Sequence, residues 1–337
     1  MKAMVTGGAG FLGRHLVERL KKEGHFVRAV DLPSADFSGL QEQAVEIISG
    51  DLRDAGMVDR ACAGMDLVFH VAALASPWGR RELFWSINVT ATDNVISACK
   101  MARVRRLVHV SSPSAVFDGK DQFMADESLP YPKKFLSFYS ETKAVSEQHV
   151  LAANGPELET VVIRPHAIWG PGDRHLLPRV ISRAKAGKLF QVGDGKNLVS
   201  NLYVENAVDA LLLAAEKKAA AGKIYFITDA EPVKIWEMVR RILSELGVPG
   251  PRGKIPFWAA YSLAAAQELV WKVLQLKGEP NITRYTVSEL AKNHTYSIEA
   301  AKKDLGYVPK VSAQEGLAKV LAWLKESGIP GVPQSQL

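Results

Sequence analysis

Cysteine is scarce in this sequence, whose 337 residues include only Cys62 and Cys99. Two cysteines cannot form a disulfide framework, so we expect a reducing compartment, the cytoplasm. Long apolar runs are missing as well. The first ten residues reach glycines too soon for a signal peptide, and the charge-free run at 255–267 is shorter than the about 20 residues that span a bilayer. Hydrophobic and charged fractions of 47% and 23% exclude disordered and fibrous proteins.

A strong concentration of charge is also missing. The formal net charge is +6, from 42 Lys+Arg and 36 Asp+Glu, and the basic residues are mostly spread in pairs such as Arg80-Arg81. A nucleic-acid-binding protein would gather them in one stripe with aromatic residues between them, so we expect no nucleic-acid partner. One denser stretch could bind a carboxylate or phosphate, or form a solvated helix face; it contains Arg174, His175, Arg179, Arg183, Lys185 and Lys188.

The first half of the chain alternates between short β-branched runs and longer amphipathic runs. The predicted strands are 2–6, 26–30, 45–48, 67–71, 106–110 and 160–163, and the predicted helices are 11–23, 54–63, 83–102 and 138–153. Strands that alternate with helices form a parallel sheet covered on both faces. The sequence therefore predicts the α/β class with a doubly wound parallel sheet, the Rossmann fold.

The second half is less regular. Prolines and glycines follow the sixth strand, a helix at 204–217 and a strand at 223–228 indicate a return to the sheet, and further helices are predicted at 234–246 and 313–326. We expect a Rossmann domain over 1–165, to which 194–228 returns. A smaller C-terminal substrate-binding lobe would then comprise 166–193 and 229–330.

The residues TGGAGFLG at 6–13 predict a phosphate-binding loop. Gly7, Gly10 and Gly13 follow a predicted strand and open a predicted helix, which is the context that gives a lone glycine triplet its meaning. Glycine permits the tight turn and lets backbone N–H groups approach a pyrophosphate at the helix N-terminus. We therefore place Phe11 and Leu12 with the three glycines in a dinucleotide site.

The ends of the next strands supply further cofactor residues. Asp31 ends the second strand, where a carboxylate can accept hydrogen bonds from a ribose and would repel a 2′-phosphate. This favours NAD, with NADP as the alternative. We expect Asp51 and Leu52 beside the adenine, and Ala72 and Ala73 against a ribose.

A tyrosine, a lysine and a serine form the predicted catalytic set. Tyr139 and Lys143 share one face of the predicted helix 138–153, and the serines follow the fifth strand, at the edge where doubly wound folds bind ligands. A nearby cation makes a tyrosine hydroxyl, with an unperturbed pKa of about 10, a usable acid or base near neutral pH. We assign Ser112 as the assisting serine and Ser111 to the cofactor, although Ser114 lies within one turn of the same position. No metal is expected.

These motifs resemble those of the extended short-chain dehydrogenases/reductases over nearly the whole chain. The matching pieces are TGGAGFLG at 6–13, His70–Ala73, Asn88-Val89-Thr90, Ser111-Ser112, Tyr139…Lys143 and RPHAIWGPGD at 164–173. The segments at 111–120, 126–144 and 193–216 are most similar to the 3β-hydroxysteroid dehydrogenase/sterol-4-carboxylate 3-dehydrogenase group.

This resemblance implies an NAD(P)-dependent oxidoreductase that interconverts a secondary alcohol and a ketone by hydride transfer. It implies Tyr139 as the acid/base, Lys143 on the ribose and Pro165 near the nicotinamide amide. Asn88 joins the cofactor residues through its matching motif. Two rival functions stay open: a sugar-nucleotide epimerase or dehydratase, and a non-catalytic dinucleotide-binding regulator.

Bulky apolar side chains in the loops after strands four to six favour an apolar substrate over a sugar nucleotide. The expected substrate is a 3β-hydroxysteroid or sterol-4-carboxylate, or a long-chain 2-alkyl-3-keto acid of the kind reduced in bacterial olefin synthesis. The residues we place at this substrate are Trp78, Ser114, Phe117, His166, Trp169 and Arg174.

The apolar segment at 255–276 is flanked by Lys254, Lys272 and Lys277. It could be an interfacial helix in peripheral contact with a membrane, a lid over the substrate, or a contact between two copies of the chain. We expect a homodimer.

Overall fold

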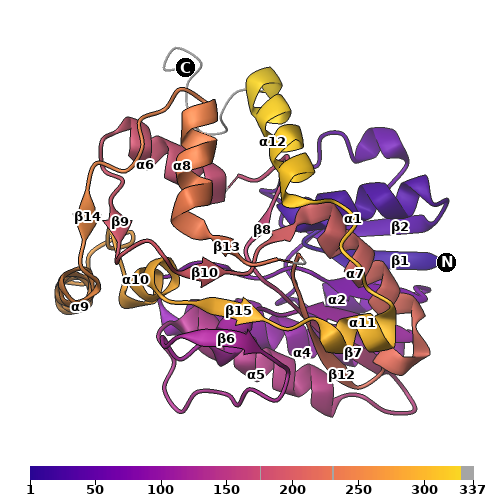
Figure 1. The fold of residues 1–337 in the computed structure, drawn as a ribbon. Helices are drawn as coiled ribbons and strands as arrows, with labels where there is room; N and C mark the ends of the chain where they lie inside the picture. Colours follow the sequence, from indigo (N-terminus) through magenta and orange to yellow (C-terminus); the bar gives the residue numbers. More distant parts are fainter. Residues whose placement is uncertain (175, 230, 328–337) are drawn as a thin grey trace.

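The computed structural model describes residues 1–174, 176–229 and 231–327. Its centre is a seven-stranded sheet in the order β3-β2-β1-β4-β5-β7-β12, in which every neighbouring pair is parallel (Figure 1). The strands are β1 (Lys2–Thr6), β2 (Phe26–Asp31), β3 (Glu46–Ser49), β4 (Leu67–His70), β5 (Arg106–Val110), β7 (Glu159–Pro165) and β12 (Lys223–Ile227). The order reverses at β1, as in a doubly wound fold, so the predicted fold class is confirmed.

Helices cover both faces of this sheet (Figure 1). Successive side chains of a strand point to opposite faces, so Ala3 and Val5 pack in one core and Met4 in the other. The first core takes in α1 (Phe11–Lys22) and α7 (Val204–Glu216), and the second takes in α2 (Ala55–Cys62), α4 (Ala91–Met101) and α5 (Phe138–Ala152).

The predicted helix 83–102 is interrupted. The structure has α3 (Arg81–Trp85), a π-helical turn over Ser86–Thr90, and then α4. The turn carries Asn88, whose amide accepts a hydrogen bond from Leu74 N at 2.7 Å and donates to Thr142 Oγ1 at 3.0 Å. These bonds tie the loop after β4 to α5, and π-turns are common where a helix serves a site.

A third core lies beside the seven-stranded sheet, among short elements. Its four-stranded sheet has the order β13-β10-β15-β6, formed by β6 (Gln122–Ala125), β10 (Leu198–Val199), β13 (Val233–Lys234) and β15 (His294–Tyr296). Two small pairs join β8 (Ile168–Trp169) to β11 (Leu202–Tyr203), and β9 (Gln191–Val192) to β14 (Lys254–Ile255). The helices here are α6 (Leu176–Lys185), α8 (Ile235–Glu245), α9 (Phe257–Val273), α10 (Arg284–Ala291) and α12 (Ala313–Ser327), whereas α11 (Glu299–Leu305) packs in the first core, against β12 and α7. Short 3-10 turns occupy Gln41–Gln43, Pro113–Val116 and Lys218–Ala220.

The chain passes between these parts more than once. β12 and α7, from the segment 194–228, lie in the seven-stranded sheet and beside α1, whereas β6, from the first 165 residues, pairs with β15. The predicted domain boundaries stay a prediction. In the predicted lobe, His175, Ala230 and residues 328–330 lie outside the described part of the chain.

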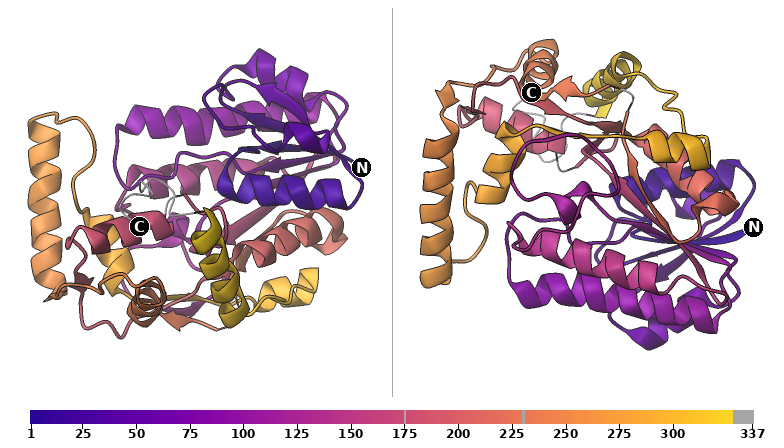
Figure 2. Two further views of the ribbon diagram at one scale, coloured as in Figure 1. Left: turned by 90° about the horizontal axis from the view of Figure 1, so that it is seen from above. Right: turned by 60° about the horizontal axis from the view of Figure 1, so that its bottom comes forward.

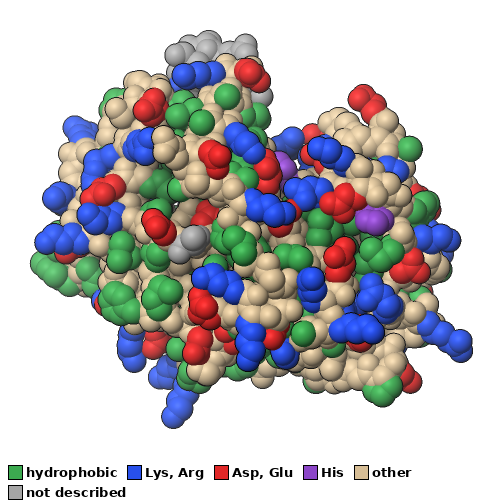
Figure 3. Space-filling model, turned by 45° about the vertical axis from the view of Figure 1, so that its right-hand side comes forward, with side chains coloured by type: hydrophobic (Ala, Val, Ile, Leu, Met, Phe, Trp, Pro, Cys, Tyr) green, Lys and Arg blue, Asp and Glu red, His purple; other side chains and the backbone are tan. Residues whose placement is uncertain are grey.

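Helix α9 stands at the edge of the molecule in both views of Figure 2. Its most exposed apolar side chains include Trp258 and Val273, which are 72% and 67% accessible. No helix in the described ranges is long and apolar enough to cross a membrane. On the face shown in Figure 3, basic and acidic side chains are interspersed rather than gathered.

Candidate active site

A cavity of about 520 Å³ lies at the C-terminal ends of the central strands. The predicted cofactor residues that line it are Gly7, Gly10, Phe11, Leu12, Gly13, Asp31, Asp51, Leu52, Ala72, Ala73, Ser111, Tyr139, Lys143 and Pro165. Asn88 does not line it, because its amide is used to hold the neighbouring loop at Leu74. The catalytic candidate Ser112 is also in the wall. The structure thus brings segments from six strand ends to one cavity.

The glycine loop forms a cradle that other residues could not form. Gly7 has φ +67°, and a Cβ at this position would lie 2.8 Å from Ala72 N. A Cβ at Gly13 would lie 2.0 Å from Gly7 O. Gly10 begins α1 without a side-chain cap, so the first N–H groups of the helix are available to an anion. This geometry fits a pyrophosphate.

Two further observations fit a dinucleotide. The carboxylate of Asp31 is oriented by backbone N–H groups, with Oδ2 accepting from Ala9 N at 3.1 Å and Oδ1 from Leu32 N at 2.8 Å. Ser111 Oγ is buried and has no hydrogen-bond partner among the described residues, although it lies in the cavity wall. A buried hydroxyl of this kind is satisfied when a polar ligand binds.

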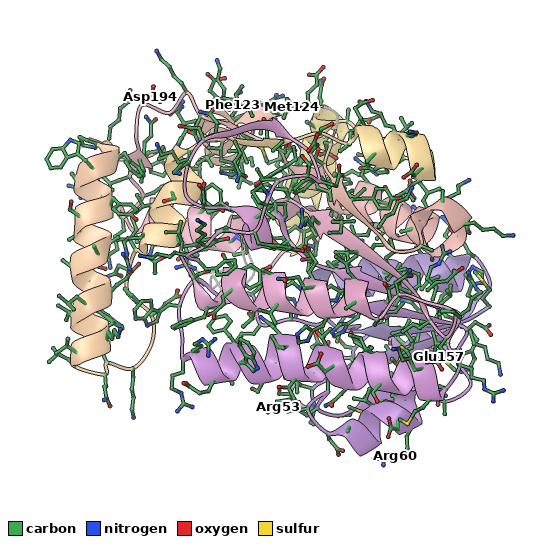
Figure 4. The ribbon with its side chains drawn as sticks, turned by 90° about the horizontal axis from the view of Figure 1, so that it is seen from below. Arg53, Arg60, Phe123, Met124, Glu157 and Asp194 are labelled. Atoms are coloured by element: carbon green, nitrogen blue, oxygen red, sulfur yellow. The ribbon has the colours of Figure 1, made fainter. Side chains whose placement is uncertain are left out.

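Arg53 is a wall residue that sequence reasoning missed. Its Nε lies 2.9 Å from Asp51 Oδ2, and this interaction lowers the pKa of the Asp51 carboxyl. Figure 4 shows Arg53 at the outer margin of the molecule. The position of Arg53, two residues after Asp51, could have indicated this from the sequence, because Asp51 was itself predicted beside the adenine.

The catalytic candidates meet at the other end of the cavity. Helix α5 begins at Ser137, whose hydroxyl accepts from Ser140 N at 3.1 Å, and this start brings Tyr139 to the end of β5. Burial raises the pKa of the Tyr139 hydroxyl, and a hydrogen bond with Ser112 lowers it. The Ser114 hydroxyl is instead 2.7 Å from the hydroxyl of Tyr285. Of the three candidate serines, Ser112 is thus the one that hydrogen-bonds with Tyr139.

Lys143 is a buried cation held by neutral groups. Its Nζ donates to Val110 O at 2.7 Å and lies 3.4 Å from His109 Nε2. Burial lowers the pKa of Lys143 to about 8 and that of His109 well below its usual value, so the histidine is neutral. Lys143 therefore carries the positive charge at neutral pH without help from the imidazole.

A second buried histidine fixes this region. His70 Nε2 lies 2.9 Å from Thr92 Oγ1, which itself donates to Asn88 O, so the hydroxyl oxygen accepts and Nε2 carries the proton. His70 Nδ1 then accepts from Thr6 Oγ1 at 2.8 Å. Burial lowers the pKa of His70 to about 3. His70 thus joins β1, β4 and α4 beneath the site.

The predicted substrate residues do not come together at this cavity. Phe117 and Trp169 are buried, Phe117 against the ring of His294 and Trp169 against that of Tyr203. These large rings fill the interior where the C-terminal elements pack, and their assignment to a substrate stays a prediction. Arg174 is exposed and pairs with Asp36 at 3.2 Å.

Two more basic side chains of that stretch have surface partners. Arg179 pairs with Glu279 at 2.8 Å, and Arg183 donates to Asn281 O at 2.6 Å. Trp78 is partly buried in the loop after β4. The solvated-face interpretation of the stretch accounts for these contacts.

Three groups of the C-terminal lobe that were not predicted reach the site. Tyr285, Glu289 and His294 come from α10 and β15, and with His166 they extend the polar groups beyond Ser114. Only His166 of these was expected near a substrate. Their positions more than 100 residues away from the motifs left no sequence signal.

The side chains of His166, Glu289 and His294 offer ligand atoms within 4.8 Å of one another. His294 Nε2 donates to the carbonyl of Glu289 at 2.7 Å, so its Nδ1 accepts from His166 Nε2 at 2.6 Å. The two facing nitrogens are therefore joined by one hydrogen bond, which uses the lone pair that a metal would need.

Comparisons with known proteins agree with this geometry. The model of the 3-beta hydroxysteroid dehydrogenase/isomerase family matches residues 4–257. The 2-alkyl-3-oxoalkanoate reductase of Stenotrophomonas maltophilia (strain K279a) is 43% identical over 328 residues, which cover 96% of this chain and 99% of that protein. The sterol-4-alpha-carboxylate 3-dehydrogenase, decarboxylating, of Mus musculus is 38% identical over 329 residues, or 95% and 90% of the two chains. The structure of MoeE5 in complex with UDP-glucuronic acid and NAD is similar with a TM-score of 0.77 and 27% identity, covering 97% of this chain and 100% of that one.

Proposed function

Because the chain belongs to the 3-beta hydroxysteroid dehydrogenase/isomerase family, among the extended short-chain dehydrogenases/reductases, we propose that it is a 2-alkyl-3-oxoalkanoate reductase. Such an enzyme interconverts the ketone of a 2-alkyl-3-keto acid and the secondary alcohol of the 3-hydroxy acid. The observation that carries the proposal is the hydrogen bond between Ser112 and Tyr139, in the wall of a cavity that also holds Lys143 and the glycine loop.

The residues present fit a nicotinamide dinucleotide, and we propose NAD, with NADP as the alternative. The glycine loop would hold the pyrophosphate and the Asp31 carboxylate an adenosine ribose. Ser111, Lys143 and Pro165 line the opposite end of the cavity. When bound, this cofactor supplies or accepts the hydride.

The chain's own residues handle the oxygen and its proton. Ser112 orients the Tyr139 hydroxyl by hydrogen bonding, and Tyr139 donates the proton that the ketone oxygen needs. Lys143 is charged below about pH 8 and favours the tyrosinate that remains. In the oxidative direction the same hydroxyl accepts the proton of the alcohol.

A sterol-4-carboxylate is the second candidate substrate, favoured by the match to the mouse dehydrogenase. Both substrates place the reacting oxygen β to a carboxylate, so both ketones lose carbon dioxide easily. The more complete match to the bacterial reductase, 99% of its length, ranks the 2-alkyl-3-keto acid first.

The test is turnover of synthetic 2-alkyl-3-hydroxy acids with NAD, followed at 340 nm, beside a sterol-4-carboxylate. We expect Tyr139→Phe to lower kcat by at least about 100-fold while NAD still binds, because proton transfer by a positioned side chain contributes this much. Near-normal turnover in this variant would refute the mechanism. A UDP-sugar that raises the melting temperature when the hydroxy acids do not would favour an epimerase.

We also propose that α9 contacts a membrane surface from the cytoplasmic side. Trp258, Leu269 and Val273 project from it, and Lys272 and Lys277 lie at its C-terminal end. An apolar face rimmed by lysines suits an anionic bilayer. Co-sedimentation with vesicles containing phosphatidylserine should fall when Trp258 and Val273 become serine. The alternative is that a second copy of the chain covers this face of α9, as in the predicted homodimer. A dimer that dissociates in the same variant would contradict the membrane proposal.

A further inference from the structure

A row of polar side chains joins Tyr139 to a carboxyl group of the C-terminal lobe. Tyr139 hydrogen-bonds with Ser112, and Ser112 Oγ donates to Ser114 Oγ at 3.0 Å. The Ser114 hydroxyl is 2.7 Å from the Tyr285 hydroxyl, which hydrogen-bonds with the carboxyl group of Glu289. We name these five residues the hydroxyl row. Its four hydroxyl groups can each donate and accept a hydrogen bond at once.

The row connects two parts of the fold. Ser112 and Ser114 belong to the 3-10 turn that follows β5, whereas Tyr285 and Glu289 lie four residues apart on α10. Residues at this spacing share one face of a helix, so the geometry of α10 brings the phenol and the carboxyl together. The ends of the row are thus held by secondary structure and not by flexible loops.

Glu289 combines a carboxyl group of raised pKa with access to water. Burial raises the pKa of its carboxyl group. His294 and the hydrogen bond with Tyr285 offset part of this rise in pKa. The carboxyl group is also faced by the hydroxyls of Tyr139 and Tyr296, whose pKa values it raises. The Glu289 side chain is nevertheless 24% solvent-accessible.

We propose that the hydroxyl row is a proton relay through which Glu289 supplies or removes the proton that Tyr139 exchanges with the substrate. In the reduction, the O–H bond of Tyr139 breaks as the substrate oxygen takes its proton. The tyrosinate then takes the hydroxyl proton of Ser112, and Ser112 takes that of Ser114. Ser114 in turn takes the proton of the Tyr285 hydroxyl, and Tyr285 takes the proton of the Glu289 carboxyl group. The carboxylate left on Glu289 regains a proton from water.

The balance needs no further reagent. Every step breaks one O–H bond and forms another, and the hydride comes from the cofactor of the proposed function. The oxidation runs the row in reverse, and in the resting structure Ser112 already donates toward Ser114, away from Tyr139. A route of this kind matters because ligands that fill the cavity exclude water from the wall that holds Tyr139.

Glu289→Gln tests the relay, because it keeps the size and polarity of the side chain and removes its acid. We expect kcat to fall roughly 10- to 100-fold with an unchanged KM for NAD, as proton delivery becomes rate-limiting. The solvent deuterium isotope effect on kcat should rise, and the pH dependence of kcat should lose the limb that Glu289 contributes. Tyr285→Phe, which breaks the row without touching the acid, should give the same rise in isotope effect.

The matched control is Ser288→Ala on the same helix, where the hydroxyl donates to the carbonyl of Arg284 at 2.9 Å. It should behave as the wild type. If Glu289→Gln and Tyr285→Phe lose activity without any change in the isotope effect, their role is structural and the relay is refuted. Wild-type values in both variants refute it as well.

This inference rests on the proposed function, and the two fail differently. A wild-type enzyme that turns over its substrate while the variants match it overturns the relay alone. A wild-type protein that turns over none of the 2-alkyl-3-hydroxy acids or sterol-4-carboxylates overturns the proposed function, and the relay falls with it.

Discussion

The buried charge of Lys143 is expected to lower the free energy of unfolding of the protein. Its side chain is buried, and burial lowers its pKa from 10.5 to about 8. Each unit of such a shift corresponds to about 1.36 kcal/mol, so keeping the charged lysine inside the folded protein costs about 3 kcal/mol at neutral pH. Lys143→Met removes this cost but leaves Val110 O without the donor that now lies 2.7 Å away. That loss is about 1–2 kcal/mol, so we expect the variant to be about 1 kcal/mol more stable.

The pH dependence gives the sharper test. Between about pH 8 and 10.5 the unfolded wild-type chain still binds the proton that the folded protein has released. Wild-type stability therefore rises with pH across this window, whereas the variant has no lysine to titrate. Between about pH 7 and 9.5, the unfolding free energy of the wild type should therefore increase by about 2 kcal/mol relative to that of Lys143→Met.

Urea unfolding followed by tryptophan fluorescence at both pH values measures this difference. Lys120→Met is the control, because the Lys120 side chain is 83% accessible and folding does not desolvate it. Turnover should be lost in Lys143→Met and kept in the control. A stability difference that stays constant with pH would show that Lys143 is not desolvated, and the reasoning would fail.

Three other replacements test separate parts of the site. Asp31→Ala should weaken NAD binding about tenfold and remove the preference for NAD over NADP, as isothermal titration with both cofactors measures; an unchanged preference would contradict the ribose assignment. Gly13→Ala puts a Cβ 2.0 Å from Gly7 O, so the loop must shift. This shift should weaken NAD binding by about 1–3 kcal/mol. An unchanged Kd for NAD would contradict the role of the glycine loop in binding the pyrophosphate. Glu147→Ala leaves Arg164 buried without the carboxylate that now accepts from its Nε at 3.0 Å, which should lower the unfolding free energy by about 3–5 kcal/mol in urea titration.

The sequence was informative where structure depends on local pattern. The predicted strands 2–6 and 106–110 coincide with β1 and β5, and the predicted helix 138–153 differs from α5 by one residue. Repeated burial on one face imposes a period that a single sequence displays. The glycine loop and the Tyr139–Lys143 pair are local in the same sense, since one turn and one helix face hold each of them.

In the C-terminal half, the predicted helices 234–246 and 313–326 match α8 and α12, but the short strands were missed, for a different reason. β8, β10 and β13 have only two residues each, too few to show alternation, and β15 pairs with β6 across 170 residues of chain. Tertiary packing decides such elements. Tertiary packing also determines the orientation of Trp169. We predicted this residue in a loop beside the substrate, but its side chain is buried against Tyr203.

The electrostatics of Lys143 connect these two kinds of information. The nearby carboxylate, Glu147 one helical turn away, is already bound by Arg164, with Nη2 at 2.5 Å and Nε at 3.0 Å. The groups that hydrogen-bond the lysine, Val110 O and His109 Nε2, are neutral. A buried cation whose immediate partners are neutral stabilises an anion that forms beside it more than it would in water, because the local dielectric is low. Tyrosinate on Tyr139, one helical turn from Lys143 in the same cavity wall, is the anion that the proposed reaction creates. The energy spent on burying Lys143 is therefore recovered in the step where that charge develops.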